Sequence, residues 1–190
     1  MIRGVIFDMD GTITVPYINW QLLRDRIGAT PGQSIMDYIE GLPEERSRWA
    51  NAELLKTEME AAQYAEANDG IIELIQSLLA RGIRLSVVTN NHRAAMRTVL
   101  KRYDLQFDTA LAREDGILKP APDLIHKALT GMDLTAQEVV TVGDGRYDIE
   151  ACERAGVRCI YLTNGHPTLE HSPSVDSLSD VLPLIEADLA

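Results

Sequence analysis

Cysteine is scarce in this chain, and its placement predicts neither a disulfide framework nor a zinc centre. Cys152 and Cys159 are the only cysteines among the 190 residues. They form no CxxC pair, and neither they nor the four histidines, His166 included, show the spacing of a zinc site. We therefore expect both thiols to be reduced and structural.

Positive charge is also in short supply. The sequence has 18 lysines and arginines against 29 aspartates and glutamates, which gives a formal net charge of -11, and it contains no basic run. Such a charge repels the phosphate backbone of nucleic acids and the surface of anionic membranes, so neither is an expected partner. A small anionic ligand is still compatible, because a bound divalent cation reverses the local potential.

Long apolar runs are missing as well. The first apolar run, Val5-Ile6-Phe7, reaches an aspartate too soon for a signal peptide or a membrane span. We find no internal repeat and no low-complexity tract, and the content of 45% hydrophobic and 25% charged residues is ordinary. The sequence therefore predicts a globular cytoplasmic protein, and it gives no indication of the oligomeric state.

The chain does contain an alternation of strand-like and helix-like segments. We predict strands near residues 2–7, 83–88, 107–111, 138–142 and 157–162. We predict helices near residues 71–79, 92–102, 122–131, 146–155 and 178–187. This alternation is typical of the α/β class, with a Rossmann-like parallel sheet and helices on both of its faces.

Residues 15–69 interrupt the alternation. They have little β-branched content and an amphipathic repeat through Trp49, Leu55, Met59 and Ala62, while prolines and glycines divide them into about three helices. We expect residues 1–14 and 70–190 to form a catalytic core and residues 15–69 to form a small inserted helical cap. The alternative is a set of surface helices without a part in catalysis.

Two carboxylates follow the first predicted strand, in the segment Asp8-Met9-Asp10-Gly11-Thr12. Gly11 permits a sharp exit from the strand. Two acids in different environments suit a division of labour, in which one stays ionised as a nucleophile or metal ligand and the other carries a proton. The alternative is a polar strand end followed by a turn.

Further polar residues follow the other predicted strands, where the ligand site of an open parallel sheet lies. The segment Thr89-Asn90-Asn91 could hold an anion, or its Thr and Asn side chains could cap the following helix. Lys119, held extended by Pro120, could face a nucleophilic aspartate or could be solvated. Asp144 and Asp148 suit Mg²⁺, which prefers oxygen ligands, although Asp148 could instead only cap its helix.

Taken in order, these segments resemble the four motifs of the haloacid dehalogenase-like hydrolase superfamily. The residues that carry the resemblance are Asp8-Met9-Asp10-Gly11-Thr12, Thr89-Asn90, Lys119-Pro120, and Gly143-Asp144 with Asp148. The similarity covers nearly the whole chain from Ile2 to about Gly165, and it is greatest to the phosphoglycolate phosphatase-like branch, although the insertion is shorter than is usual there.

The resemblance implies a Mg²⁺-dependent phosphatase that hydrolyses a small phosphorylated metabolite through an aspartyl-phosphate. It implies a nucleophile at Asp8, a general acid and base at Asp10, phosphate-holding residues at Thr89, Asn90 and Lys119, Mg²⁺ ligands at Asp8, Asp10 and Asp144, and a supporting acid at Asp148. Asp10 would bind the metal through its backbone carbonyl.

Other functions remain open at this point. A sugar phosphomutase would use the same nucleophile and metal, a signalling receiver would keep a long-lived phospho-aspartate, and a binding protein on this fold would not turn over at all. Lys56, the only lysine of the insertion, has no context that supports a Schiff base. Arg24, Arg26, Arg46 and Arg48 could contact a second anionic group of a substrate or could be solvated.

Overall fold

The computed structural model describes residues 1–187, and within them the chain forms one sheet of six parallel strands in the order β3-β2-β1-β4-β5-β6. The strands are β1 (Gly4–Phe7), β2 (Arg84–Val88), β3 (Thr109–Leu111), β4 (Val139–Gly143), β5 (Arg158–Leu162) and β6 (Ser174–Val175). The predicted α/β class and its five strands are confirmed. The two-residue edge strand β6 was missed, because so short a segment shows no alternation of apolar residues.

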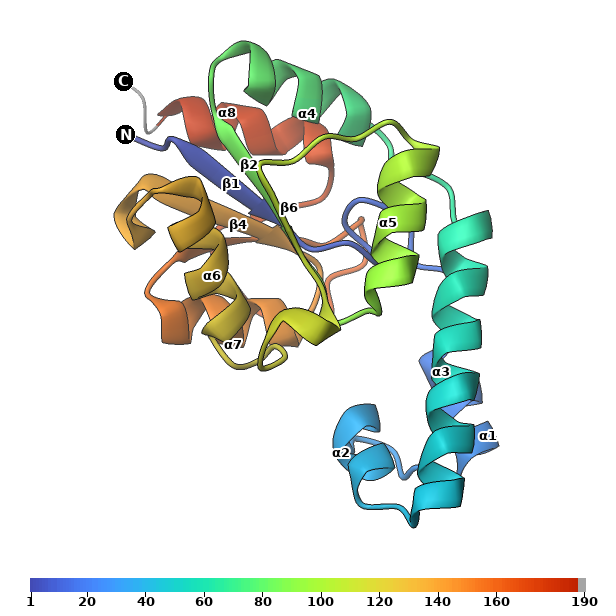
Figure 1. The fold of residues 1–190 in the computed structure, drawn as a ribbon. Coiled ribbons are helices and arrows are strands. Elements are labelled where there is room, and N and C mark those ends of the chain that lie inside the picture. Colours follow the sequence, from blue (N-terminus) through green and yellow to red (C-terminus); the bar gives the residue numbers. More distant parts are fainter. Residues whose placement is uncertain (188–190) are drawn as a thin grey trace.

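Helices cover both faces of the sheet (Figure 1). One face is covered by α4 (Ile71–Ala80), α5 (Arg93–Arg102) and α8 (Val181–Ala187), and the other by α6 (Asp123–Met132) and α7 (Arg146–Ala155). Three 3₁₀ turns complete the core: η1 (Arg113–Asp115), η2 (Ala136–Glu138) and η3 (Leu178–Asp180). No helix within residues 1–187 combines the length and the apolar character that crossing a membrane requires.

The alternation of side chains along β1 explains why the sheet needs helices on both faces. Val5 and Phe7 belong to the apolar cluster of α4, α5 and α8, whereas Ile6 belongs to that of α6 and α7. All three side chains are 0% exposed. A strand that is apolar on both sides is typical of a sheet buried between two helical layers.

The order in which the chain adds strands to the sheet reverses between β1 and β4. It runs from β1 outward to β2 and β3, and it then returns to β4 on the other side of β1. The crossovers on the two sides of this point lie on opposite faces, which opens a crevice at the carboxyl ends of β1 and β4. Asp8 and Asp144 directly follow these two strands.

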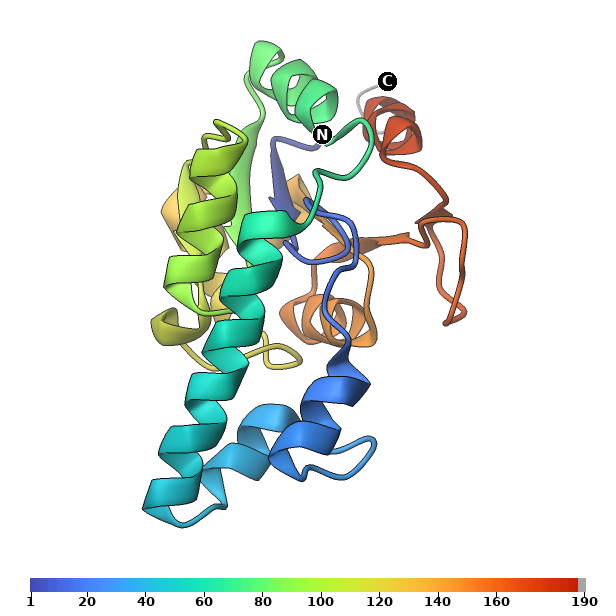
Figure 2. The same ribbon diagram turned by 90° about the vertical axis from the view of Figure 1, so that its right-hand side faces the viewer.

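Residues 15–69 contain the three helices that the sequence predicts: α1 (Trp20–Ile27), α2 (Ile35–Glu40) and α3 (Glu44–Tyr64). Leu23, Ile27, Ile39, Ala50 and Leu54 form an apolar cluster among these helices. Figures 1 and 2 show α1 and α2 beside the first half of α3, away from the sheet.

Helix α3 belongs to two packing units at once. Its second half lies along α5 of the core (Figures 1 and 2), and Ala62 joins the apolar cluster of α4 and α5. Arg102 of α5 donates a hydrogen bond to the carbonyl of Ala65 (2.7 Å), and so does the Tyr103 hydroxyl (2.7 Å). The helix therefore connects the insertion rigidly to the core.

The buried face of α3 matches the predicted one only in part: Ala62 is buried and Met59 packs against the core cluster, but Trp49 and Leu55 do not lie on the buried face. The buried residues are Ala50, Leu54, Glu58, Ala61 and Ala62, whereas Trp49 is 37% exposed and Leu55 is only partly buried. The prediction followed the large apolar side chains, but small alanines and an ion-paired glutamate fit the close contact with α5. The guanidinium of Arg46 instead lies 4.5 Å from the centroid of the Trp49 ring.

Candidate active site

A buried lysine joins two carboxylates at the carboxyl edge of the sheet. The ammonium of Lys119 donates to Asp8 Oδ1 (2.6 Å), to Asp148 Oδ1 (2.5 Å) and to the carbonyl of Val88 (3.0 Å). Lys119, Asp8 and Asp148 are all buried, with 6%, 8% and 4% of their surface exposed. The second oxygen of Asp148 accepts from the backbone N–H of Gly145 (3.1 Å), so both oxygens of this carboxylate are engaged.

Asp144 completes an acidic cluster with Asp8 and Asp148. Carboxylate oxygens of Asp8, Asp144 and Asp148 lie within 4.8 Å of one another. Gly11, with a φ of 81°, passes so close that a Cβ at this position would lie 1.9 Å from Asp144 Oδ2. Glycine is therefore required both for the backbone conformation and for the approach of Asp144.

The pKa values of the charged groups in this cluster are shifted, because the groups are buried close to one another. Burial and the Asp148 carboxylate raise the pKa of Asp8 well above its ordinary value, although Lys119 opposes the shift. Burial and Asp148 also raise the pKa of Asp144, to about 7. Burial alone would lower the pKa of Lys119, but Asp148 and Asp8 outweigh it and raise this pKa.

The composition of the cluster tests whether a magnesium ion fits it. Three carboxylates face one ammonium, so a full set of charges leaves an excess of negative charge that a divalent cation would balance. The ligand atoms are oxygens alone, which suits Mg²⁺ and not zinc. The residues present therefore fit the expected metal.

Asp10 lies apart from this cluster and is held by a different residue. Its carboxylate Oδ2 accepts a hydrogen bond from the side-chain amide of Asn91. Burial raises the pKa of Asp10 to about 6, and the negative charge of Glu58 adds to the shift. Beyond Asp10, the carbonyl of Gly11 accepts from Asn164 Nδ2 (2.8 Å), which fixes the turn after the strand.

The segment 89–92 departs from the sequence-based alternative in which Thr89 or Asn90 caps helix α5. The N-cap is His92, whose Nδ1 accepts from the N–H of Ala94 (3.1 Å). Thr89 is 2% exposed, and its hydroxyl accepts from the N–H of Asn91 (3.1 Å). A longer connection between β2 and α5 than expected leaves three residues free to face the site.

Asn90 uses its side chain to hold the backbone of Lys119. Its Oδ1 accepts from the N–H of Lys119 (2.9 Å), and its Nδ2 donates to the carbonyl of the same residue (2.8 Å). Through its side chain, Asn90 acts on the site by fixing the lysine.

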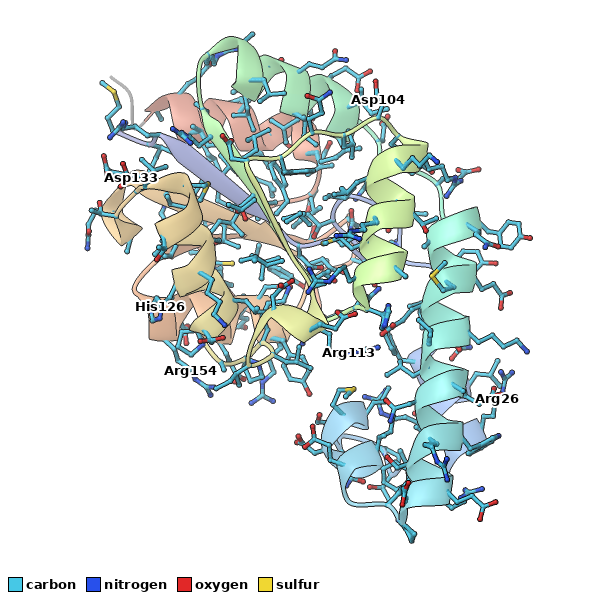
Figure 3. All side chains as sticks on the ribbon, viewed as in Figure 1. Arg26, Asp104, Arg113, His126, Asp133 and Arg154 are labelled. Carbon is cyan, nitrogen blue, oxygen red and sulfur yellow. The ribbon has the colours of Figure 1, made fainter. Side chains whose placement is uncertain are left out.

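Two charged residues near the site were missed by sequence reasoning. Glu58 of α3 is 1% exposed and accepts from both terminal nitrogens of Arg113, at 2.6 and 3.1 Å. It also accepts from the N–H of His92 (3.1 Å). Figure 3 shows Arg113 on the side of the core that faces α3. Neither residue belongs to a motif, and their positions 55 residues apart gave no signal.

The arginines of the insertion have partners within the insertion itself. Arg26 pairs with Glu53 at 3.0 Å and lies on the outer side of the helices (Figure 3), and Arg48 pairs with Glu44 at 3.8 Å. Arg24 donates to the carbonyl of Trp20 and Arg46 to that of Ile27. The side chains of Lys56 and His166 are exposed.

Comparisons with known proteins place this geometry in a family. Residues 16–162 match the model of the family described as haloacid dehalogenase-like hydrolase. An uncharacterised hydrolase of Saccharomyces cerevisiae is 30% identical over 200 residues, which cover 97% of this chain and 91% of that protein. A phosphoglycolate phosphatase of Pectobacterium atrosepticum is 28% identical over 216 residues, which cover 97% and 92% of the two chains.

A solved structure supports the fold. The crystal structure of a HAD-superfamily hydrolase from Ehrlichia chaffeensis covers 100% of both chains with a TM-score of 0.71 at 24% identity. The match over most of the chain and the 30% identical relative confirm the resemblance that the sequence motifs indicated: the chain belongs to the haloacid dehalogenase-like hydrolases.

Proposed function

We propose that this protein is a Mg²⁺-dependent phosphatase that hydrolyses a small phosphate monoester through an aspartyl-phosphate on Asp8. The observation that carries the proposal is the environment of the Asp8 carboxylate at the carboxyl end of β1. One of its oxygens contacts Lys119 at 2.6 Å, and the carboxylates of Asp144 and Asp148 lie nearby. An attacking carboxylate, a cation for the phosphoryl oxygens and a set of metal ligands therefore converge at one point.

The reaction proceeds in two displacements at phosphorus. A carboxylate oxygen of Asp8 attacks the phosphorus, and the ester oxygen leaves as an alcohol after it takes the proton of Asp10. Asp10 then removes a proton from the water that attacks the aspartyl-phosphate, which releases inorganic phosphate and regenerates Asp8. With a pKa of about 6, Asp10 is able both to give and to take a proton near neutral pH.

Asp8 and Asp144 would hold the metal through their carboxylates, and Asp10 through its backbone carbonyl. Asp148 has both oxygens engaged, with Lys119 and with the N–H of Gly145, so its role is to orient these groups. Bound Mg²⁺ supplies positive charge that offsets the repulsion between the Asp8 carboxylate and the phosphate.

The remaining residues position the phosphoryl group. The hydroxyl of Thr89 and the ammonium of Lys119 contact its oxygens, and Asn90 holds the backbone of Lys119 in place. Since phosphoryl transfer has little covalent chemistry for the protein to arrange, positioning and charge neutralisation supply most of the rate.

Residues 15–69 serve as the cap of this site, and residues 1–14 with 70–190 form the catalytic core. The insertion leaves the sheet directly after the Asp8 segment, and this point of departure supports a cap over the substrate side. The phosphoglycolate phosphatase among the relatives supports a small phosphorylated acid as substrate. The cap would select it by shape, since the arginines of α1 and α3 are engaged within the insertion.

The variant Asp8→Asn tests the proposal with p-nitrophenyl phosphate and Mg²⁺. It keeps the size of the side chain but removes the nucleophile, so turnover should fall by about 10⁴-fold or more. Asp133→Asn is the matched control, because Asp133 is exposed at the end of α6, far from the insertion (Figure 3). Turnover by folded Asp8→Asn at the wild-type rate would refute the proposal.

A panel of phosphorylated metabolites then identifies the substrate and separates the other functions. A phosphatase releases inorganic phosphate from at least one member at a steady rate. An isomerised sugar phosphate would indicate a phosphomutase, and a stable phospho-Asp8 without release would indicate a receiver. Lack of turnover with every member would indicate a binding protein.

A further inference from the structure

We propose that Glu58 and Arg113 are positioning residues: their buried ion pair ties helix α3 of the insertion to the segment 89–92 and thereby fixes the residues that perform phosphoryl transfer. The inference rests on the proposed function for its catalytic consequence, and on the contacts of the pair for its structural part.

The pair holds the segment 89–92 from both sides. Glu58 accepts from the N–H of His92 at 3.1 Å. Arg113 donates its backbone N–H to the carbonyl of Asn91 (2.9 Å), and its guanidinium lies 3.4 Å from the carbonyl of Asn90. Three consecutive residues of the segment are therefore bonded to one ion pair.

Two residues of this segment, Asn90 and Asn91, in turn bond residues of the candidate site. Asn90 bonds both backbone groups of Lys119, whose ammonium contacts Asp8. The side chain of Asn91 donates to Asp10, and Thr89 is the buried hydroxyl next to them. A shift of the segment would move the lysine and the proton carrier together, and a misplacement of about 1 Å lowers the rate by roughly 100-fold.

A purely structural role does not explain why this contact uses a buried ion pair. A buried ion pair adds little to stability compared with apolar residues of the same volume, because both charges lose their hydration. The contact between α3 and α5 already has Ala61, Ala62 and the Arg102 and Tyr103 hydrogen bonds to hold it. The guanidinium of Arg113 donates two parallel hydrogen bonds to the carboxylate of Glu58. This geometry fixes the orientation of both planar groups.

The test compares Glu58→Gln and Arg113→Lys with control substitutions of the same two kinds at exposed positions. Glu60→Gln changes an exposed residue of α3, and Arg97→Lys changes an exposed residue of α5. Two readouts are taken: kcat and KM with p-nitrophenyl phosphate and Mg²⁺, and hydrogen exchange of the backbone amides of residues 89–92.

We expect Glu58→Gln to lower kcat by about 10- to 100-fold with a KM change below about threefold, because the displaced groups act in the transition state. Arg113→Lys keeps the positive charge but cannot donate two parallel hydrogen bonds to Glu58, so this variant should retain part of the activity. Exchange of the His92 and Asn91 amides should rise roughly tenfold in Glu58→Gln through local opening. The double variant should lose no more activity than the less active of the two single variants, since the two residues act as a unit.

Wild-type kcat and unchanged exchange at residues 89–92 in folded Glu58→Gln would overturn the inference, and so would equal losses in Glu60→Gln. If Glu58→Gln does not fold, Glu58→Asp keeps the charge with a shorter reach and gives the same comparison. A wild-type protein without turnover would refute the proposed function instead, and the exchange readout would still decide whether the pair fixes the segment.

Discussion

Lys119 is the residue on which the charge balance of the site depends. Its ammonium is the cation that contacts both Asp8 and Asp148, and all three groups are buried. Removal of one partner from a buried ion pair leaves uncompensated charge, which destabilises a protein more than the pair itself stabilises it. Lys119 is therefore predicted to matter for stability as well as for turnover.

We predict that Lys119→Met lowers the free energy of unfolding by about 3–5 kcal/mol at pH 7. Turnover should fall by roughly 10²- to 10³-fold, since one donor to the phosphoryl oxygens is lost. The destabilisation should be smaller at pH 5, because Asp8, whose pKa is already raised, takes up a proton. Urea unfolding and steady-state assays measure both effects.

Lys127→Met is the control for this substitution, because Lys127 forms an exposed pair with Asp123 at 3.0 Å. Such exposed pairs contribute little to stability, because solvent screens the two charges. Equal losses of stability in the two variants would contradict the account of Lys119.

We predict that Asp144 makes the response to Mg²⁺ depend on pH. Its pKa is raised from 3.8 to about 7 in the folded state. At pH values between these two, the Asp144 carboxyl holds a proton in the folded state and has lost it in the unfolded state. Without metal, this group therefore makes the protein less stable as pH rises through that window. Mg²⁺ competes with the proton, so the rise in Tm on addition of Mg²⁺ should be small at pH 5 and large at pH 8.

Thermal unfolding at the two pH values, with and without Mg²⁺, checks this prediction. Asp144→Asn should show a much smaller rise in Tm at pH 8, because the neutral amide removes both the titration and the ligand. A rise in Tm of the same size at pH 5 and pH 8 in the wild type would argue against Asp144 as a ligand.

At the scale of elements, helix α3 carries the connection between the insertion and the core. Leu54 is 2% exposed in the cluster of α1, α2 and α3, whereas the adjacent Leu55 is only partly buried. Leu54→Ala should lower the free energy of unfolding by about 2–5 kcal/mol, and Leu55→Ala by about 1 kcal/mol or less. Chemical unfolding of the two variants decides between this helix face and the one predicted from Trp49 and Leu55, which would reverse the order.

Most core elements could be predicted from the sequence because their signals are local. The alternation of strands and helices after residue 70 depends on neighbouring residues, and the structure has these elements close to their expected bounds. The face of α3 could not be predicted in the same way. It includes Glu58, which is buried with Arg113 as its partner 55 residues away, and a pattern of apolar residues does not reveal such a polar contact.

The same distinction separates the residues of the candidate site. Asp8 and Asp144 end adjacent parallel strands, so the order of the strands alone brings them together. Asn91 was considered only for an anion or a helix cap, whereas its side chain in fact holds Asp10, 81 residues away. A hydrogen bond between distant residues leaves no periodic trace in the sequence.

At the scale of the whole molecule, the candidate site lies where three parts meet. The sheet supplies Asp8 and Asp144, the loops supply Lys119 and the segment 89–92, and α3 reaches that segment through Glu58. The net charge of -11 is expected to disfavour polyanions as partners. The proposed function requires a cation at the cluster of Asp8, Asp144 and Asp148.

The most direct test of the account is to trap the phosphoryl group on the protein. The variant Asp10→Asn keeps the nucleophile Asp8 but lacks the general base. Because nitrophenolate leaves without taking up a proton, p-nitrophenyl phosphate should still phosphorylate this variant. Phosphorylation should then be faster than the release of the phosphoryl group by water. Acid quench, proteolysis and mass spectrometry should then find the phosphoryl group on Asp8 when Mg²⁺ is present, and on no peptide when the metal is removed with EDTA. A phosphoryl group on another residue, or turnover by the wild type with no phosphorylated Asp8 in either protein, would contradict the account.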